Sequence, residues 1–177
     1  GWTVADGRRI KQGLLYRGCE LDGAEEPKYT LSEVGKSFML TQMNIKTEMD
    51  LRNKAETPGA MDMLGANVKH TYYAAPMYNA AFNADQSETM RRIFADLADP
   101  TQYPAYLHCT YGLDRTGTVC YLLGALLGVE QDDLMKDYEL SIMCHGYVAT
   151  EQMTAFVKQV NELPGVTLTE KVKHYML

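Results

Sequence analysis

Cysteine and histidine are scarce in this 177-residue chain, and neither is spaced as a disulfide scaffold or a metal site requires. The cysteines form no C-x-x-C pair, and the histidines form no H-E-x-x-H or H-x-H pattern. A disulfide scaffold is not expected at this length and apolar content, so all four cysteines are predicted to be reduced. The same spacings predict neither a metal site nor a cofactor. The residues concerned are Cys19, Cys109, Cys120 and Cys144, and His70, His108, His145 and His174.

The chain also lacks a long hydrophobic run. The longest run, 119–129, is interrupted by Gly124 and Gly128 and falls short of the roughly 18 residues that a membrane span requires. Stable membrane insertion is therefore not expected. No signal peptide is recognisable, but the chain starts at Gly1 and not at a methionine, so an upstream segment could have been removed. The compartment stays open between the cytoplasm, as first choice, and a periplasmic or secreted location.

An excess of positive charge is missing as well. The formal net charge is −6, with 17 Lys and Arg against 23 Asp and Glu. This balance argues against a nucleic-acid partner, because proteins that bind the phosphate backbone usually carry a basic stripe. Hydrophobic residues make up 46% and charged residues 23%, which is typical of a globular protein and not of a disordered one. The length suits one domain over residues 1–177.

Residue patterns predict an alternation of strands and helices followed by helices alone. Thr30 and Glu33 form a capping-box pattern, and Leu31, Val34 and Phe38 then share one apolar helix face. Segment 75–86 has no regular pattern, which is typical either of a binding loop or of a plain surface excursion. The predicted strands are 11–17, 45–52, 67–74 and 104–108, and the predicted helices are 30–43, 87–99, 115–129 and two or three amphipathic segments after 130.

This order of elements indicates an α/β fold. We expect a central, mostly parallel sheet of four or five strands flanked by helices, with a helical C-terminal half. Ligands of such sheets bind beyond the carboxyl ends of the strands. Cys109 occupies that position, because it directly follows the buried strand 104–108 and precedes the buried helix 115–129.

The stretch H-C-T-Y-G-L-D-R-T-G, residues 108–117, has the composition of an anion-binding loop. Successive backbone N–H groups ahead of a helix form a nest for phosphate oxygens. Gly112 permits a positive φ inside the loop, and Gly117 permits close approach at the first helical turn. Arg115 can hold two phosphate oxygens with its planar guanidinium, whereas a cation at a helix N-terminus without an anion would oppose the helix dipole.

The same stretch offers a nucleophile. Only a thiolate attacks, and the positive field of Arg115 and the loop amides favours the thiolate of Cys109. Thr116 can donate its hydroxyl to that sulfur. His108 is expected to hydrogen-bond the loop backbone and hold its shape, not to act as a base. On the alternative interpretation, Cys109 is a buried core thiol and Arg115 is a surface residue.

These ten residues resemble the H-C-x-x-G-x-D-R-T-G signature of a branch of the cysteine-dependent protein tyrosine phosphatases, which includes bacterial tyrosine, dual-specificity and lipid phosphatases. Weaker similarities extend along most of the chain. They are the strand "GLLYRGCEL", the strand end "EMDLRN" and the helix pair "GVEQDDLMKDYELS". The start at Gly1-Trp2 is similar to the tail of the family's entry segment. The resemblance thus implies that family residues are missing before Gly1, and further ones could be missing after the C-terminus.

The resemblance implies a metal-independent protein tyrosine phosphatase that forms a phosphocysteine on Cys109, with Arg115 as the phosphate clamp. Thr116 assists the sulfur. Asp114 is the expected general acid, and Asp85, on the irregular segment, is the rival. The loop residues expected to bind substrate are His108, Thr110, Tyr111, Gly112, Leu113 and Gly117.

Several alternatives stay open. Some family members that act on phosphoinositides have Lys where this chain has Leu113, so phosphotyrosine substrates are favoured over a phosphorylated lipid or dual specificity. Tyr111, Tyr78 and Phe82 could line an aromatic slot for the substrate ring. The other hypotheses are a non-catalytic phosphate-recognition module and a cysteine-dependent oxyanion reductase or sulfur transferase. A reductase would need a second thiol, for which Cys120 is the nearest candidate. The sequence leaves the oligomeric state undetermined.

Overall fold

The computed structural model describes residues 1–55, 57 and 62–176, without the side chains of Cys144, His145 and Met176. Across these residues, no helix combines the length and the apolar character that crossing a membrane requires. Cys19, Cys109 and Cys120 are not in disulfides, while the side chain of Cys144 lies outside the described part.

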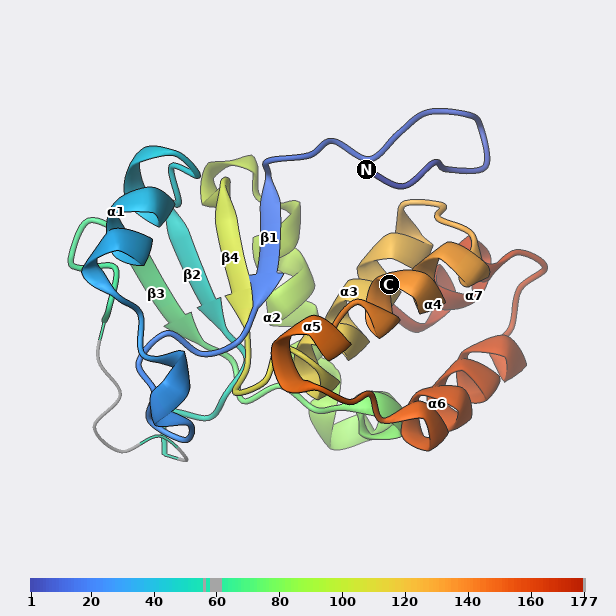
Figure 1. The fold of residues 1–177 in the computed structure, drawn as a ribbon. Coiled ribbons are helices and arrows are strands. Elements are labelled where there is room, and N and C mark those ends of the chain that lie inside the picture. The colour runs from blue at the N-terminus through green and yellow to red at the C-terminus, as the bar shows by residue number, and fades with distance from the viewer. Residues whose placement is uncertain (56, 58–61, 177) are drawn as a thin grey trace.

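A parallel sheet forms the centre of the molecule (Figure 1). Within the described residues it has four strands in the order β1-β4-β2-β3, so the predicted α/β class and strand direction are confirmed. The strand β4 is central and fully buried, as its unbroken apolar run predicts. The strands are β1 (Leu15–Gly18), β2 (Thr47–Asp50), β3 (Lys69–Tyr72) and β4 (Ala105–His108).

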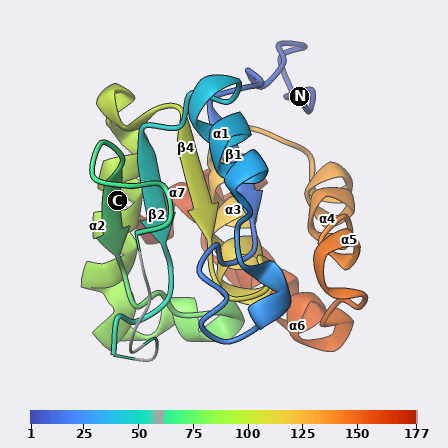
Figure 2. The same cartoon turned by 60° about the vertical axis from the view of Figure 1, so that its left-hand side comes forward.

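Helices cover both faces of the sheet (Figures 1 and 2). Helix α1 lies over one face and helices α2 and α3 over the other, where their apolar side chains share one core with Met49 and Leu107 of the sheet. The later helices gather beside α3, so the helical C-terminal half is confirmed. The helices are α1 (Glu33–Thr41), α2 (Ser87–Ala98), α3 (Asp114–Leu126), α4 (Gln131–Glu139), α5 (Ile142–His145), α6 (Thr150–Glu162) and α7 (Leu168–Met176).

The N-cap expected for helix α1 is wrong. Ser32, not Thr30, caps the helix by accepting a hydrogen bond from the Gly35 N–H, because Thr30 instead donates its hydroxyl to a backbone carbonyl in the preceding turn. Val34 and Phe38 are 81% and 55% exposed, so the apolar stripe that they form faces away from the sheet.

Segment 75–86 is more ordered than its irregular sequence suggests. It forms two short 3-10 helices, Tyr78–Phe82 and Ala84–Gln86. Tyr78 and Ala81 are buried in the main core, and Phe82 stacks on Phe156 at 5.6 Å between ring centres. The segment is therefore packed against the helical half of the molecule by aromatic side chains that alternate with small residues.

Candidate active site

Cys109 is the first residue after β4, and the loop from Cys109 to Leu113 leads directly into α3. The residue is only 4% exposed. Since β4 lies between β1 and β2, the loop starts at the middle of the sheet, at the edge where all the parallel strands end. This is the position at which open α/β sheets bind their ligands.

The Cys109 sulfur has a hydroxyl donor. The Oγ1 atom of Thr116 lies 3.2 Å from Cys109 Sγ, and Thr116 is fully buried in the first turn of α3. The expected Thr116–Cys109 contact is thus present. The sulfur therefore lies beside a hydroxyl donor at a helix N-terminus, a position that suits a bound anion.

Gly112 gives the loop its tight curvature. Its φ of 68° lies in the left-handed region, and a Cβ atom there would stand 2.4 Å from the carbonyl oxygen of Gly18. Any other residue would therefore be strained in conformation and would clash with the end of β1. Thr110 adds a second connection to the same segment, since its carbonyl accepts a hydrogen bond from the Glu20 N–H at 3.0 Å.

Arg17 fixes the loop from the side. One of its nitrogens donates to the Gly112 carbonyl at 2.9 Å and to Ser141 Oγ at 2.7 Å, and the other forms an ion pair with Asp137 at 2.7 Å. The guanidinium thereby links β1, the loop and the α4–α5 region. Sequence patterns do not reveal this role, because the partners of Arg17 lie far away along the chain.

The other loop residues differ in what they expose. Tyr111 is half-buried and packs edge-on against Tyr29, with 6.4 Å between ring centres. The Leu113 side chain is completely buried, so only its backbone can face a bound anion. Gly117 allows the close approach that was expected, and the group that approaches it is the ring of Tyr138. A Cβ atom at Gly117 would stand 2.8 Å from that ring.

Arg115 is the second residue of α3 and is partly exposed at the same edge of the sheet. Its side chain has interactions within the protein. Its place in the first turn is the one that the sequence predicts for a phosphate clamp. The assignment of that role stays a prediction.

Asp114, the first residue of α3, is held by a tyrosine. The Tyr78 hydroxyl donates to Asp114 Oδ1 at 2.6 Å and lies 2.7 Å from the Tyr138 hydroxyl. The Tyr78 N–H donates to Thr118 Oγ1 at 2.7 Å, so both ends of this residue are tied to α3. Burial, followed by the hydrogen bonds to Asp114 and Tyr138, raises the pKa of Tyr78 far above its usual value.

Tyr78 also has an unusual backbone. Its φ of 50° is rare for a bulky residue and costs conformational energy, which persists only where the surroundings hold the residue in place. Its ring is 7% exposed and packs edge-on against Phe156. Phe82 is stacked on Phe156 and does not line the cavity that adjoins Asp114, whereas Tyr78 does line it, so the aromatic slot stays a prediction for Tyr78.

A cavity of about 470 Å³ adjoins Asp114. It is open to solvent and is bounded by segment 75–86 and by the link between α5 and α6. Asp85, the rival acid, does not line it. Asp85 is exposed and accepts a hydrogen bond from its neighbour Gln86 at 3.0 Å. The cavity-lining residues are Met77, Tyr78, Asp114, Tyr147, Val148, Ala149, Thr150, Glu151 and Gln152.

His108 holds the loop from below. Its Nδ1 lies 3.3 Å from the carbonyl oxygen of Cys109, which is the predicted contact with the loop backbone, and its Nε2 lies 2.9 Å from Glu48 Oε1. The ring is completely buried. Sequence reasoning missed Glu48, because it comes from a neighbouring strand 60 positions earlier.

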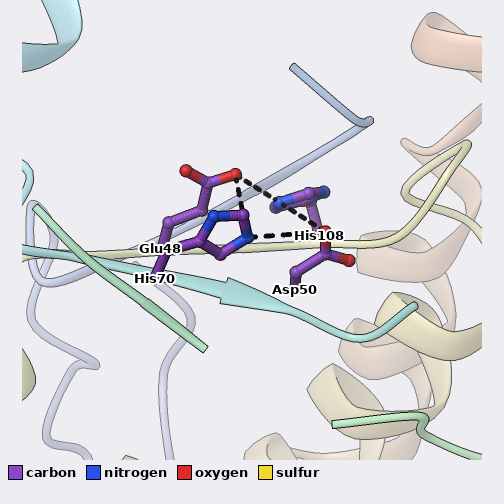
Figure 3. Close-up of side chains that lie close together, drawn as sticks. All are labelled: Glu48, Asp50, His70 and His108. Carbon is purple, nitrogen blue, oxygen red and sulfur yellow. Dashed lines mark hydrogen bonds and ion pairs between the residues drawn. The ribbon is translucent and has the colours of Figure 1, made fainter. Parts of the chain in front are cut away.

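Glu48 belongs to a polar cluster on the α1 face of the sheet, together with Asp50, His70 and His108 (Figure 3). One ligand-type atom from each side chain lies within 4.8 Å of the others, so these are the described residues that could hold a metal ion. Burial lowers the pKa of His70, but the surrounding carboxylates, Asp50 first among them, outweigh burial and raise it to about 9.

Arg52 closes the cluster towards β1. Its guanidinium is 1% exposed and forms ion pairs with Glu20 at 2.5 Å, Asp22 at 3.0 Å and Asp50 at 2.6 Å. Burial raises the pKa of Asp50, but His70, His108 and Arg52 outweigh burial and hold it well below the usual range. Asp50 and Arg52 of the Asp-Leu-Arg segment therefore form a buried structural ion pair.

Comparison with known proteins agrees with this geometry. The sequence model described as "Tyrosine phosphatase family" matches residues 1–176. The chain belongs to this tyrosine phosphatase family. Its expected family resemblance is thus confirmed, and its loop is the family's signature segment as read from the sequence.

One curated relative of this tyrosine phosphatase family member is H16_A0669 of Cupriavidus necator, whose name gives it provisionally as a tyrosine-protein phosphatase. It is 26% identical over an alignment of 166 positions, and the match covers 78% of this chain and 56% of the relative. The chain thus spans little more than half the length of that relative.

Two solved structures share the fold. The core catalytic domain of the PP-IP phosphatase SIW14 from S. cerevisiae, in complex with citrate, gives a TM-score of 0.54 at 14% identity and covers 84% of this chain and 82% of its own. TpbA of P. aeruginosa gives a TM-score of 0.55 at 16% identity, and the match covers 99% of this chain and 96% of TpbA. At these identities the likeness establishes the fold.

Proposed function

We propose that residues 1–177 form one phosphatase domain that hydrolyses phosphomonoesters, with phosphotyrosine in proteins as its preferred substrate. The observation that carries this proposal is the hydroxyl of Thr116 3.2 Å from the sulfur of Cys109, at the N-terminus of a buried helix. A core thiol needs no such donor. A thiolate that must attack and later leave is stabilised by one.

In the first step the Cys109 thiolate attacks phosphorus, an S–P bond forms and the P–O bond to the alcohol breaks. Loop amides and Arg115 hold the three equatorial oxygens, where charge gathers in the transition state. Asp114 gives its proton to the departing oxygen. In the second step water attacks the phosphocysteine, Asp114 takes a proton from that water, and phosphate and the thiolate are released.

Asp114 suits the acid role better than Asp85. It lines the open cavity beside the loop, and the Tyr78 hydroxyl fixes one carboxylate oxygen while the other is left for the substrate. Asp85 points to solvent and has its hydrogen bond with the adjacent residue. A group can act as an acid only within reach of the leaving oxygen.

A reductase function is less well supported. Desolvation raises the pKa of the Cys120 thiol to about 11, which keeps it protonated and unsuited to act as a resolving thiolate. A phosphate-recognition module needs no residue in the position of Asp114. The retention of thiol, hydroxyl donor and carboxylate around one loop favours turnover.

The test is a substrate panel of phosphotyrosine peptides, phosphoserine peptides and phosphoinositide micelles, assayed with wild type and Cys109→Ser. We expect hydrolysis of the phosphotyrosine peptides, inhibition by vanadate, and loss of turnover but not of phosphate binding in Cys109→Ser. Hydrolysis of phosphoinositides in preference to peptides would overturn the substrate assignment. Phosphate binding without turnover of any substrate would favour the recognition module.

A further inference from the structure

The cluster beneath the catalytic loop has the composition of a transition-metal site. Glu48 and Asp50 are two residues apart on β2, so their side chains leave the same face of the sheet. His70 on β3 is the register partner of Glu48, and His108 on β4 is the register partner of Asp50. Figure 3 shows the four side chains turned towards one another. Two imidazoles and two carboxylates are ligands that zinc accepts.

The spacing of the four groups fits one ion among them. His70 Nε2 lies 3.7 Å from Glu48 Oε1 and 3.6 Å from Asp50 Oδ2. His108 Nε2 lies 2.9 Å from the same Glu48 oxygen and 3.8 Å from the same Asp50 oxygen. In a tetrahedral zinc site with metal–ligand distances near 2.0–2.2 Å, neighbouring ligand atoms are about 3.4 Å apart.

Both histidines are oriented as metal ligands are. His70 Nδ1 lies 2.5 Å from Asp62 Oδ1, and His108 Nδ1 lies 3.3 Å from the Cys109 carbonyl oxygen. Histidines that bind metals almost always use their second nitrogen in this way, on a carboxylate or a backbone carbonyl. In both rings it is Nε2 that remains, and both Nε2 atoms face the cluster.

The His70 nitrogen is a second, independent observation. Its side chain is only 8% exposed, and its Nε2 atom has no hydrogen-bond partner within the described residues. A proton on Nε2 would face the carboxylate oxygens of Glu48 and Asp50 at 3.7 and 3.6 Å, which are ion-pair distances longer than a good hydrogen bond. An ion of about 2 Å bonding distance placed between these atoms would satisfy this nitrogen.

The charge of the region favours a cation. Four carboxylates, from Glu20, Asp22, Glu48 and Asp50, are at most 3% exposed. They outnumber the three groups beside them that can carry positive charge, which are the Arg52 guanidinium and the imidazoles of His70 and His108. Buried charge is costly unless it is paired. Arg52 already hydrogen-bonds both oxygens of Asp50, so Asp50 is the weakest of the four ligands and Glu48, His70 and His108 are the principal ones.

We propose that this chain binds one divalent transition-metal ion, of the zinc class, through Glu48, His70 and His108, with Asp50 completing the site. The ion has a structural role. It fixes the His108 ring, and through it the carbonyl of Cys109 at the base of the catalytic loop. The site takes no part in the phosphoryl chemistry, so the proposal stands or falls separately from the proposed function.

The experiment is a metal titration in a Cys109→Ser background, which removes the catalytic thiol as a competing ligand. Protein stripped with EDTA is titrated with Co²⁺ at mildly alkaline pH, where protons compete less for histidine, and Co²⁺ is then displaced by Zn²⁺. We expect one ion per chain and the intense visible absorption of tetrahedral Co²⁺, without a thiolate charge-transfer band. His70→Ala should abolish this signal, and Asp62→Asn should weaken binding by about 10-fold.

The matched control is His174→Ala, which removes an exposed imidazole on α7, away from the cluster. It should bind Co²⁺ as the parent does. Circular dichroism will show whether His70→Ala folds. If it does not fold, Glu48→Gln serves as the second test, because it removes a ligand but keeps the shape of the side chain. No saturable binding by the parent, or binding that survives His70→Ala and Glu48→Gln, would overturn the proposal.

Discussion

The hydroxyl of Tyr78 lies 2.6 Å from a carboxylate oxygen of Asp114, although the two residues are 36 positions apart. Tyr78 is held there at a φ of 50° by its N–H bond to α3 and by the packing of its ring. This contact orients the carboxylate at the mouth of the loop. On the proposed mechanism, segment 75–86 supports the acid, Asp114, and does not supply it.

Tyr78→Phe should lower kcat more than it changes KM. The variant keeps the ring but releases the Asp114 carboxylate, so we expect kcat to fall about 10-fold, a fraction of what full loss of a general acid costs. The free energy of unfolding should fall by about 1 kcal/mol for the lost hydrogen bond. Steady-state kinetics and urea unfolding measure both quantities.

The control for this variant is Tyr121→Phe. Tyr121 is a buried tyrosine on α3 whose hydroxyl has no hydrogen-bond partner within the described residues. It should leave kcat unchanged. An equal loss of kcat in both variants would contradict the account. It would show that removing any hydroxyl near α3 slows the reaction, whether or not Asp114 is released.

Asp114→Asn should separate substrates by their leaving group. Phenyl phosphate needs a proton on its departing oxygen, so its kcat should fall by about 10²–10³-fold. The p-nitrophenolate ion leaves without one, so p-nitrophenyl phosphate should be affected much less. Asp85→Asn changes a surface residue, so its kcat should stay within about two-fold of the wild-type value for both substrates. The reverse pattern between the two variants would assign the acid to Asp85.

Thr116→Val replaces the hydroxyl that faces Cys109 by a methyl group of similar size. A hydrogen bond to a charged group contributes about 1.5–3 kcal/mol, so the rate of the first step should fall by roughly 10- to 100-fold. Alkylation of Cys109 by iodoacetate should slow as well, because the attacking sulfur loses its hydroxyl donor. Thr116→Ser, which keeps the donor, should restore most of both rates. No rescue by serine would refute a role for the hydroxyl.

Gly112→Ala should damage the loop through a steric clash as well as through its φ. The added Cβ meets the Gly18 carbonyl at 2.4 Å, so we expect the free energy of unfolding to fall by about 2–3 kcal/mol and phosphate binding to weaken. Gly7→Ala is the matched control, because Gly7 has a φ of 82° but nothing within 4 Å of its Cβ position. Gly7→Ala therefore has the conformational cost without the clash. If its free energy of unfolding falls as much as that of Gly112→Ala, the clash is not the cause of the loss.

The centre of the fold could be predicted from the sequence because its signals are local. An apolar strand, a glycine loop and an apolar helix follow one another within residues 104–129, and their order places Cys109 at the carboxyl edge of the sheet. Thr116 lies one helical turn into α3, so its contact with the sulfur also follows from short-range geometry.

The rest depends on contacts between distant segments. Arg17, Tyr78 and Tyr138 look like ordinary core or surface residues until the chain is folded, and only then does each acquire a partner beside the loop. The Glu48 and His70 cluster is invisible to motif spacing for the same reason, since its members come from three neighbouring strands. The outward apolar face of α1 shows that periodicity reveals a stripe but not what covers it.

The central claim is that Cys109 carries the phosphoryl group between the two steps. A phosphotyrosine peptide labelled with radioactive phosphorus can be mixed rapidly with the enzyme, quenched in acid within milliseconds, and the protein digested and mapped. The account predicts label on the peptide that contains Cys109, formed and lost at rates that match turnover, and none in Cys109→Ser. Turnover without label at Cys109, or turnover that persists in Cys109→Ser, would contradict it.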